Sequence, residues 1–269
     1  MKKDYLNEIK SIELETKIAV ISRFPLKILK ELQSLKQISH YKLLKGKIFH
    51  IRDIYFDSAT NELRKAGFAL RIRNINHQCL LTLKGKSQIS NTGAVKRLEV
   101  EDIWSYPTFT KIMYLLRKQK VLSELGEIKF FHGDPINTLK NYNLFIIHDR
   151  QSLRHQRFIK KKLLDNKSHA ELVIDSVAFR VKNKMIYHHE VEIELQALTE
   201  TDLLNSLTSS LFKIFPEDLQ IWTYNKLETG IAIEKIFIEK KLDQYLDEKN
   251  NLLPPAYQII KEYIDQIRF

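Results

Sequence analysis

Glycine is scarce in this sequence, with 7 residues among 269, which is about 3% against a usual level of roughly 7%. Folds that hold phosphate on glycine-rich loops are therefore disfavoured. Gly85, Lys86 and Ser87 imitate the end of a P-loop, but that motif needs a glycine at position 80, where the chain has Leu80. Any phosphate group would have to be held by side chains.

Cysteine and long apolar runs are also missing. The single cysteine, Cys79, can form neither an internal disulfide nor a cysteine zinc site, which fits a reducing, cytoplasmic setting. No apolar run reaches the length of about 18 residues that a transmembrane helix needs. Residues 1–10 lack the apolar stretch of a signal peptide. We therefore expect a cytoplasmic protein without a membrane partner.

Positive charge is abundant instead. The chain has 44 Lys and Arg against 33 Asp and Glu, a net charge of +11 and a pI near 9.4. This balance favours an anionic partner, which could be nucleic acid, a phosphate-rich small molecule or an acidic surface. The length predicts one large domain, or a domain with an appendage.

Charged and apolar residues alternate along several segments, as in a β-strand, where residues two apart share a face. The first segment is Ser11–Ile21, and the others are residues 68–73, 81–84, 97–101, 145–158, 172–175 and 190–195. Their charged faces carry same-sign pairs, Glu-x-Glu in three segments and Arg-x-Arg in one. For any single strand, a solvated charged face is the simpler interpretation. Because like neighbours repel, the repeated pairs favour a site where metal ions and a polyanion lie between them.

Apolar stripes at helical spacing occupy the intervening segments: Ser22–Gln37, Tyr106–Leu122 and Thr201–Phe215. Beyond residue 231 the pattern predicts two helices, interrupted around residues 250–255. The fold class we predict is α+β. It is a closed antiparallel barrel of about eight strands, a tunnel with a charged interior, wrapped by helices. Residues 1–230 would form this domain, and residues 231–269 a helical C-terminal extension packed on the barrel.

The charged motifs resemble a known family. Residues 13–17, Glu-Leu-Glu-Thr-Lys, resemble the ExExK signature of CYTH domains, also called triphosphate tunnel metalloenzymes. Residues 54–74 resemble the family's Tyr-Phe-Asp, turn and Leu-Arg-x-Arg segment. The remaining matches follow in the family's order: LTLKGK at 81–86, RLEVED at 97–102, Arg150, LVIDSV at 172–177, EVEIEL at 190–195 and YNKLETG at 224–230. The ordered set spans roughly residues 11–230 and is more specific than ExExK alone.

The resemblance implies a role for each charged position. Glu13, Glu15, Glu192 and Glu194 would be metal ligands, with Glu99, Glu101 and Asp175 as further ligands. The groups that would bind phosphate are Lys17, Arg71, Arg73, Lys84, Arg97, Arg150 and Lys226. Glu15, Lys17 and Asp175 would take part in catalysis, and the general base stays open among Glu15, Asp175 and water activated by the metal. The sequence departs from the family at Val173, where many relatives have a second acid, and at Glu190, which adds a carboxylate.

These roles agree with elementary chemistry. A triphosphate carries about four negative charges, and Arg and Lys bind its oxygens. Mg²⁺ or Mn²⁺ prefers carboxylate and water oxygens. The function expected is metal-dependent hydrolysis of a triphosphate, first of all inorganic tripolyphosphate, because no base-binding motif stands out. Thiamine triphosphate and nucleoside triphosphates are close alternatives.

Three other functions remain open: a class IV adenylyl cyclase, an RNA 5′-triphosphatase and a non-catalytic polyphosphate or nucleotide sensor. The expected partner is a triphosphate-containing small molecule, and nucleic acid only through a 5′-triphosphate end. The oligomeric state is left open. His188 and His189 are adjacent on a predicted strand, so their side chains should point to opposite faces and share no ion.

Overall fold

The structure is a computed structural model that describes residues 11–122, 130–161, 168–196, 201–239 and 241–267. The strands are β1 (Ser11–Val20), β2 (Gln37–Ile38), β3 (Tyr41–Asp57), β4 (Ala69–Ile75), β5 (Gln78–Lys84), β6 (Gln88–Ile89), β7 (Ala94–Ile103), β8 (Phe145–Lys160), β9 (Ala170–Val181), β10 (Lys184–Leu195) and β11 (Leu219–Ile221). The helices are α1 (Pro25–Ser34), α2 (Glu62–Lys65), α3 (Tyr106–Lys118), α4 (Pro135–Asn141), α5 (Thr201–Ile214), α6 (Lys226–Ile238) and α7 (Pro254–Ile267), with a 3₁₀ turn at Asp243–Tyr245.

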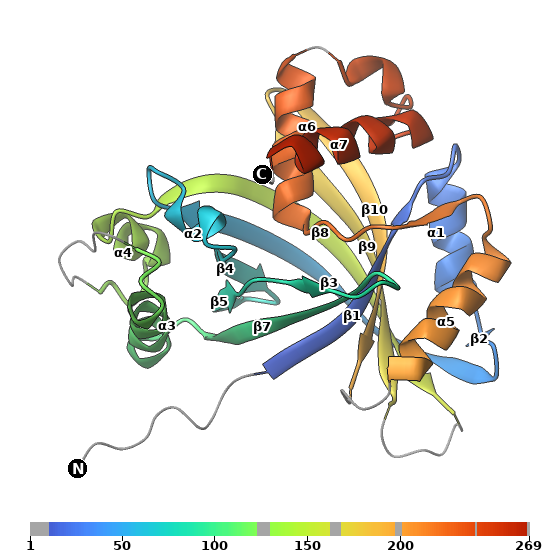
Figure 1. The fold of residues 1–269 in the computed structure, drawn as a ribbon, viewed down its shortest axis with the longest axis horizontal. Coiled ribbons are helices and arrows are strands. Elements are labelled where there is room, and N and C mark those ends of the chain that lie inside the picture. Colours follow the sequence, from blue (N-terminus) through green and yellow to red (C-terminus); the bar gives the residue numbers. More distant parts are fainter. Residues whose placement is uncertain (1–10, 123–129, 162–167, 197–200, 240, 268–269) are drawn as a thin grey trace. The chain divides into compact units, whose positions relative to one another are not determined.

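The strands pair in a single antiparallel sheet (Figure 1). Eight of them follow one another in the order β1-β10-β9-β8-β3-β4-β5-β7, and an additional pairing of β7 with β1 closes this order. The predicted class, α+β with a closed antiparallel order of eight strands, is confirmed. Seven of these strands coincide with the alternating segments, and β3 is the strand that the charge pattern did not indicate.

The chain divides into two compact units. The first unit contains Ile51–Gln88, Lys96–Asp149 and the start of β1 up to Glu13. The second contains Leu14–His50, Ile89–Val95 and the chain from Arg150 onward. Each unit has its own apolar core, and each places charged side chains on the opposite face of its strands.

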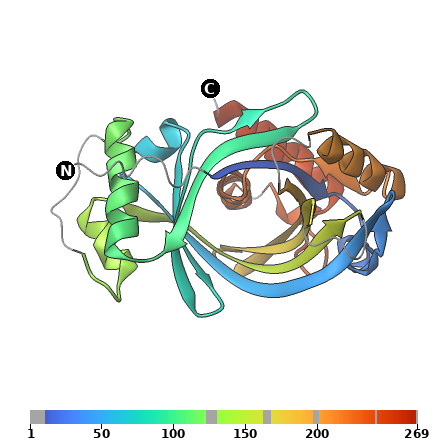
Figure 2. The same cartoon turned by 90° about the horizontal axis from the view of Figure 1, so that it is seen from below.

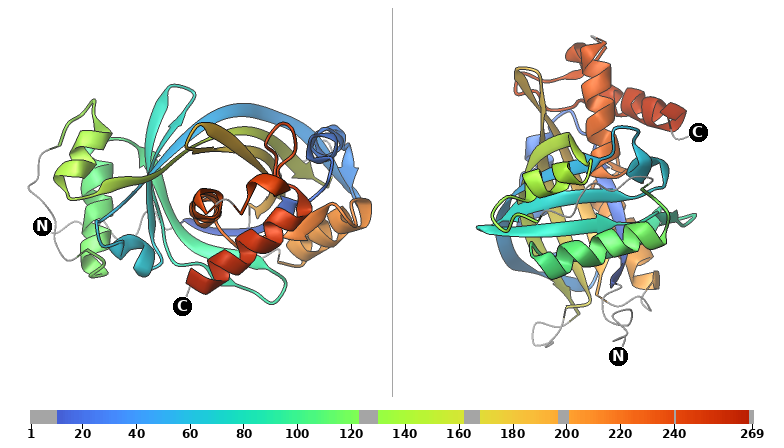
Figure 3. Two further views of the ribbon diagram at one scale, coloured as in Figure 1. Left: turned by 90° about the horizontal axis from the view of Figure 1, so that it is seen from above. Right: turned by 90° about the vertical axis from the view of Figure 1, so that its left-hand side faces the viewer.

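In the first unit, α2, α3 and α4 cover the apolar face of β4, β5 and β7 (Figure 3, right). Alternate residues of β4 and β5, such as Leu70 and Leu83, pack against Phe109 of α3. The Tyr-Phe-Asp motif contributes a structural group here. The Asp57 carboxylate accepts hydrogen bonds from the backbone amides of Leu63 at 2.9 Å and Arg64 at 3.1 Å, which fixes the turn between β3 and β4.

In the second unit, α1 and α5 both pack on one face of β1, β9 and β10 (Figure 2). This core contains Ile18, Ile174 and Val191, which alternate with the charged positions of their strands. The Arg157 guanidinium of β8 donates to the backbone oxygens of Gln33 at 2.7 Å and Leu43 at 2.9 Å. It thereby ties the end of α1 to β3.

The C-terminal helices α6 and α7 pack on the other face of β9 and β10 (Figure 3, left). That face carries Val177, Phe179 and Ile186, and further along the same strands it carries the charged residues described below. The two helices predicted for the tail are present. Among the described residues, none of the helices is long and apolar enough to cross a bilayer.

Candidate functional site

The charged face of the first unit carries four carboxylates and four cations in mutual contact, which we call the ion-pair network. Its members are Glu13, Asp53, Arg71, Arg73, Lys84, Arg97, Glu99 and Glu101. They come from the start of β1 and from β3, β4, β5 and β7, at positions that alternate with the core residues. The structure therefore brings together six predicted site residues of this unit's strands with Glu13 of β1.

One end of the network is built around Glu13. Lys84 Nζ donates to Glu13 at 3.1 Å and to Glu99 at 2.8 Å, and Arg97 Nε donates to Glu13 at 3.0 Å. Burial by itself would raise the pKa of Glu13, but Lys84 and Arg97 outweigh it and lower that pKa from 4.5 to about 2. Glu13 is therefore ionised at neutral pH and neutralised by two cations.

The other end is built around Arg71 and Arg73. Arg73 donates to both oxygens of Asp53, at 2.8 and 3.1 Å, and Arg71 Nη2 lies 3.2 Å from Glu101. Burial would raise the pKa of Glu101. Arg71, Arg73 and a 2.6 Å hydrogen bond from Thr82 instead lower it to about 2. Both arginines are thus held in a fixed orientation by carboxylates.

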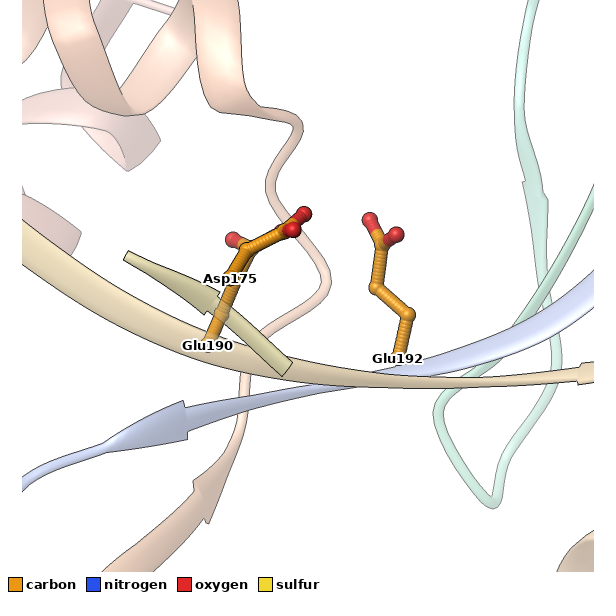
Figure 4. Close-up of side chains that lie close together, drawn as sticks. All are labelled: Asp175, Glu190 and Glu192. Carbon is orange, nitrogen blue, oxygen red and sulfur yellow. The ribbon is translucent and has the colours of Figure 1, made fainter. Parts of the chain in front are cut away.

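The second unit contains a separate carboxylate cluster, which consists of Asp175 on β9 and Glu190 and Glu192 on β10. Each offers an oxygen within 4.8 Å of the others, and all three residues are buried. Figure 4 shows the three side chains projecting to the same side of their strands. Strand register explains the grouping, because Glu190 is the cross-strand partner of Asp175 and Glu192 lies two residues further along the same face.

Two cations contact this cluster and offset part of its negative charge. Arg154 of β8 donates to both oxygens of Asp175, at 2.9 and 2.6 Å, and to Glu192 at 3.0 Å. Lys226 Nζ contacts Glu190 and lies 3.2 Å from Asp175 and 2.6 Å from Glu192. Lys226 is the first residue of α6, where a capping box of Asn225 and Glu228 fixes the start of the helix. The helix end therefore aims the ammonium group at all three carboxylates.

Burial and charge act in opposite directions in this cluster. Burial would raise the pKa of Asp175, but Arg154 and Lys226 hold it well below its ordinary value. Burial lowers the pKa of Lys226 well below its ordinary value, and the charges of Arg154 and Arg150 act in the same direction. The negative charges of Asp175 and, more weakly, of Glu15 act in the opposite direction on the pKa of Lys226. Glu15, a predicted metal ligand, therefore acts electrostatically on this cluster.

The remaining predicted residues lie on strands of the second unit. Lys17 is buried on β1, is the cross-strand partner of Glu192, and donates from Nζ to the backbone oxygen of Tyr224 at 3.1 Å. Glu15 is the cross-strand partner of Glu194. Arg150 is buried on β8. Within the described residues, the three-carboxylate group does not include Glu194.

Asp53, Arg154 and Glu190 belong to these clusters but were not among the predicted site residues. Arg154 shares its strand face with Arg150, and Glu190 shares its face with Glu192, so spacing of two or four was a usable signal. Asp53 had no such signal, because its contact with Arg73 depends on the pairing of β3 with β4.

The donor set of the carboxylate cluster fits a divalent metal ion. Three carboxylate oxygens within 4.8 Å of one another are ligands of the type that Mg²⁺ and Mn²⁺ prefer. A metal ion would have to share these oxygens with Lys226 or displace its ammonium group. In the first unit the predicted ligands Glu13, Glu99 and Glu101 contact Lys84, Arg97 and Arg71.

The model of the CYTH domain family matches residues 11–217. The chain belongs to the CYTH domain family. A search of curated proteins finds no match to the sequence. Among solved structures, HpAC1 from Hippeastrum, a candidate adenylyl cyclase described as having a dominant triphosphatase activity, is 17% identical with a TM-score of 0.52. The match covers 83% of this chain and 95% of HpAC1.

Two further solved structures show weaker similarity. A candidate adenylate cyclase from Bacillus halodurans is 20% identical with a TM-score of 0.48, over 85% of this chain and 98% of that one. The RNA triphosphatase Pct1 of S. pombe is 9% identical with a TM-score of 0.34, over 97% and 84%. At 17% identity, the similarity to HpAC1 bears on the fold alone, and it agrees with the CYTH assignment.

Proposed function

We propose that this CYTH protein is a metal-dependent triphosphatase that uses Mg²⁺ or Mn²⁺. Water would attack the terminal phosphorus, a new P–O bond would form, and the phosphoanhydride bond would break to release phosphate and the shortened polyphosphate. The water gives up a proton in this reaction, for which Glu15 and Asp175 are the protein acceptors we propose. The first substrate we propose is inorganic tripolyphosphate.

The observation that carries the proposal is the combination, in one CYTH chain, of a buried three-carboxylate group with many buried guanidinium and ammonium groups. The carboxylates Asp175, Glu190 and Glu192 fit a divalent cation. When bound, the ion would supply a Lewis acid that lowers the pKa of water and stabilises developing negative charge. A pure cation-mediated binder of polyphosphate would gain nothing from grouping three carboxylates against their mutual repulsion.

The cations would bind the substrate. We assign phosphate binding to Lys17, Arg71, Arg73, Lys84, Arg97, Arg150 and Lys226, as expected from the sequence, and we add Arg154. The arginines of the ion-pair network are already oriented by carboxylates, so less side-chain entropy is lost when phosphate oxygens are bound. We assign Glu13, Glu15, Glu99, Glu101 and Glu194 as further metal ligands or charge-balancing groups.

The domain assignment belongs to the same proposal. Residues 1–230 would form the triphosphate-binding domain, and residues 231–269 an extension packed on it. We further propose that the protein acts in the cytoplasm on a small triphosphate, with RNA bound only through a 5′-triphosphate end. The dominant triphosphatase activity described for HpAC1 supports hydrolysis over cyclisation as the first reaction to test.

A substrate panel tests the proposal. Purified protein is incubated with tripolyphosphate, thiamine triphosphate, ATP or triphosphorylated RNA, in Mg²⁺, in Mn²⁺ and in excess EDTA. Products are separated by ion-exchange chromatography. Release of phosphate that requires metal supports a triphosphatase and ranks the substrates. Cyclic AMP with pyrophosphate would identify a cyclase instead. Tight binding without turnover of any substrate would identify a sensor.

A further inference from the structure

A buried chain of hydrogen bonds leads from the C-terminal helix α7 to the carboxylate cluster. The hydroxyl of Tyr257 lies 3.3 Å from His188 Nδ1, and His188 Nε2 lies 2.9 Å from Glu190 Oε2. All three side chains are at most 1% exposed. The other oxygen of Glu190 contacts Lys226. The series of hydrogen bonds therefore ends at a member of the carboxylate cluster.

The chemistry of the three groups determines which of them donates and which accepts each hydrogen bond. We assign Glu190 as an ionised carboxylate because Lys226 lies against its other oxygen. Such a group only accepts hydrogen bonds, so His188 Nε2 carries the proton that is donated to Glu190. A neutral ring then leaves Nδ1 as an acceptor, which the Tyr257 hydroxyl can serve as a donor.

Aromatic side chains surround the His188 ring and hold it in place. His188 lies among the rings of Phe179, Trp222 and Tyr257, at centroid distances of 6.5, 6.0 and 5.6 Å. The neighbouring His189 is bound elsewhere, to Ser176 at 3.1 Å and to Asn251 at 2.8 Å.

We propose that Tyr257 and His188 are positioning residues. Tyr257 orients the His188 ring, and His188 holds Glu190 in place as a ligand in the carboxylate cluster. Helix α7 lies beyond residues 11–217, which match the CYTH family. The C-terminal extension would therefore help to build the metal site as well as cover an apolar sheet face. This inference rests on the proposed function only in so far as the cluster binds a metal ion.

The test measures Mn²⁺ binding to the full-length protein in the absence of substrate. The EPR signal of free Mn²⁺ reports how much of the ion remains unbound. Tyr257→Phe removes one hydroxyl and keeps the ring that packs on Trp222. Tyr263→Phe is the matched control. Tyr263 lies on the same helix and packs against the same core, but it is not a member of the hydrogen-bond series from Tyr257 to Glu190. Loss of a partner that orients a metal ligand weakens metal binding about 10- to 100-fold.

We expect the dissociation constant for Mn²⁺ to rise at least about 10-fold in Tyr257→Phe and to change less than about twofold in Tyr263→Phe. In a Glu190→Gln background, Tyr257→Phe should weaken Mn²⁺ binding no further, because the ligand it positions is already lost. The metal concentration for half-maximal turnover should shift with the dissociation constant, and the triphosphate KM at saturating Mn²⁺ should not.

Several results would overturn the inference. They are Mn²⁺ affinity in Tyr257→Phe that equals the wild type, equal losses in both Tyr→Phe variants, additive losses in the double variant, and a wild type that binds no Mn²⁺. A wild type that binds Mn²⁺ with the predicted pattern but hydrolyses no triphosphate would leave the positioning role intact and refute the proposed function.

Discussion

Replacing Lys226 with methionine tests the role of this cation in the carboxylate cluster separately from that of Arg154. Lys226 Nζ contacts Glu190 and lies 3.2 Å from Asp175 and 2.6 Å from Glu192. Methionine keeps an unbranched side chain of similar length and removes the charge. The variant is left with three buried carboxylates and Arg154 as their contacting cation among the ion pairs of the described residues.

The expected effect follows from the distances. Two like charges no more than 4.8 Å apart repel by at least about 3.5 kcal/mol at an effective dielectric constant of 20. Removal of one partner from a buried ion pair lowers the free energy of unfolding by about 3–5 kcal/mol. For a chain of this size, that loss corresponds to a fall in Tm of roughly 6–10 °C. We expect this fall in EDTA, where no metal can replace the ammonium group.

A divalent metal ion should reverse much of the loss. At 100 times its dissociation constant, a ligand that binds only the folded state adds about 2.7 kcal/mol. Because Lys226 no longer competes for the carboxylates, Mn²⁺ should raise the Tm of Lys226→Met more than that of the wild type. Thermal unfolding in EDTA and in a Mn²⁺ series measures both effects.

The control is Lys241→Met. Lys241 is 67% exposed and is paired with Glu239, which is 48% exposed, so its removal should change stability little. If Mn²⁺ stabilises the wild type, Lys241→Met and Lys226→Met to the same extent, the cluster is a structural ion-pair group and the assigned metal site is refuted.

Three further predictions follow from other residues. Arg73→Ala should raise the triphosphate KM by roughly 10- to 100-fold, for a lost charge-assisted contact of about 1.5–3 kcal/mol, with a much smaller change in kcat. Arg52→Ala, which removes an exposed guanidinium paired with Asp149, should leave KM unchanged, and steady-state kinetics would contradict the assignment if both variants behaved alike. Glu13 and Glu101 have pKa values lowered from 4.5 to about 2. Their stabilising contribution is therefore present above pH 4.5 and lost as the pH falls toward 2, by about 2 kcal/mol for each at pH 3. Urea unfolding at pH 7 and pH 3 measures this loss, which should shrink in Glu101→Gln. Arg157→Ala removes two donors to backbone oxygens of α1 and β3 and should lower the free energy of unfolding by about 1–3 kcal/mol without changing kcat. A kcat that falls with stability intact would show that Arg157 acts in catalysis.

The strands could be predicted because alternation of charged and apolar residues is a local property. Leu14 and Ile18 pack in a core with α1 and α5, as the spacing required, and Glu15 and Lys17 occupy the other face. Strand β3 could not be found in this way. Its first ten residues have few buried side chains on either face, so no alternating pattern marks them.

The contacts of the site could not be predicted because they depend on strand register. Glu190 faces Asp175 and Arg154 faces Asp175 only because β10, β9 and β8 pair in one particular alignment. A shift of one residue would place these groups on opposite faces. The sequence indicated that Glu190 adds a carboxylate. Nothing local showed that it would meet Asp175 and Lys226, or that Tyr257 of α7 would be linked to it through His188.

Metal-dependent phosphate release from tripolyphosphate by the wild type and by Glu192→Gln tests the central claim most directly. Glu192→Gln keeps the shape of a carboxylate cluster member and removes its charge. Metal activation is worth several kcal/mol of transition-state stabilisation. We therefore expect turnover in Mn²⁺ or Mg²⁺ that stops in excess EDTA and falls at least about 100-fold in the variant, with substrate binding partly retained. Turnover that continues unchanged in EDTA, or in Glu192→Gln, would contradict the account.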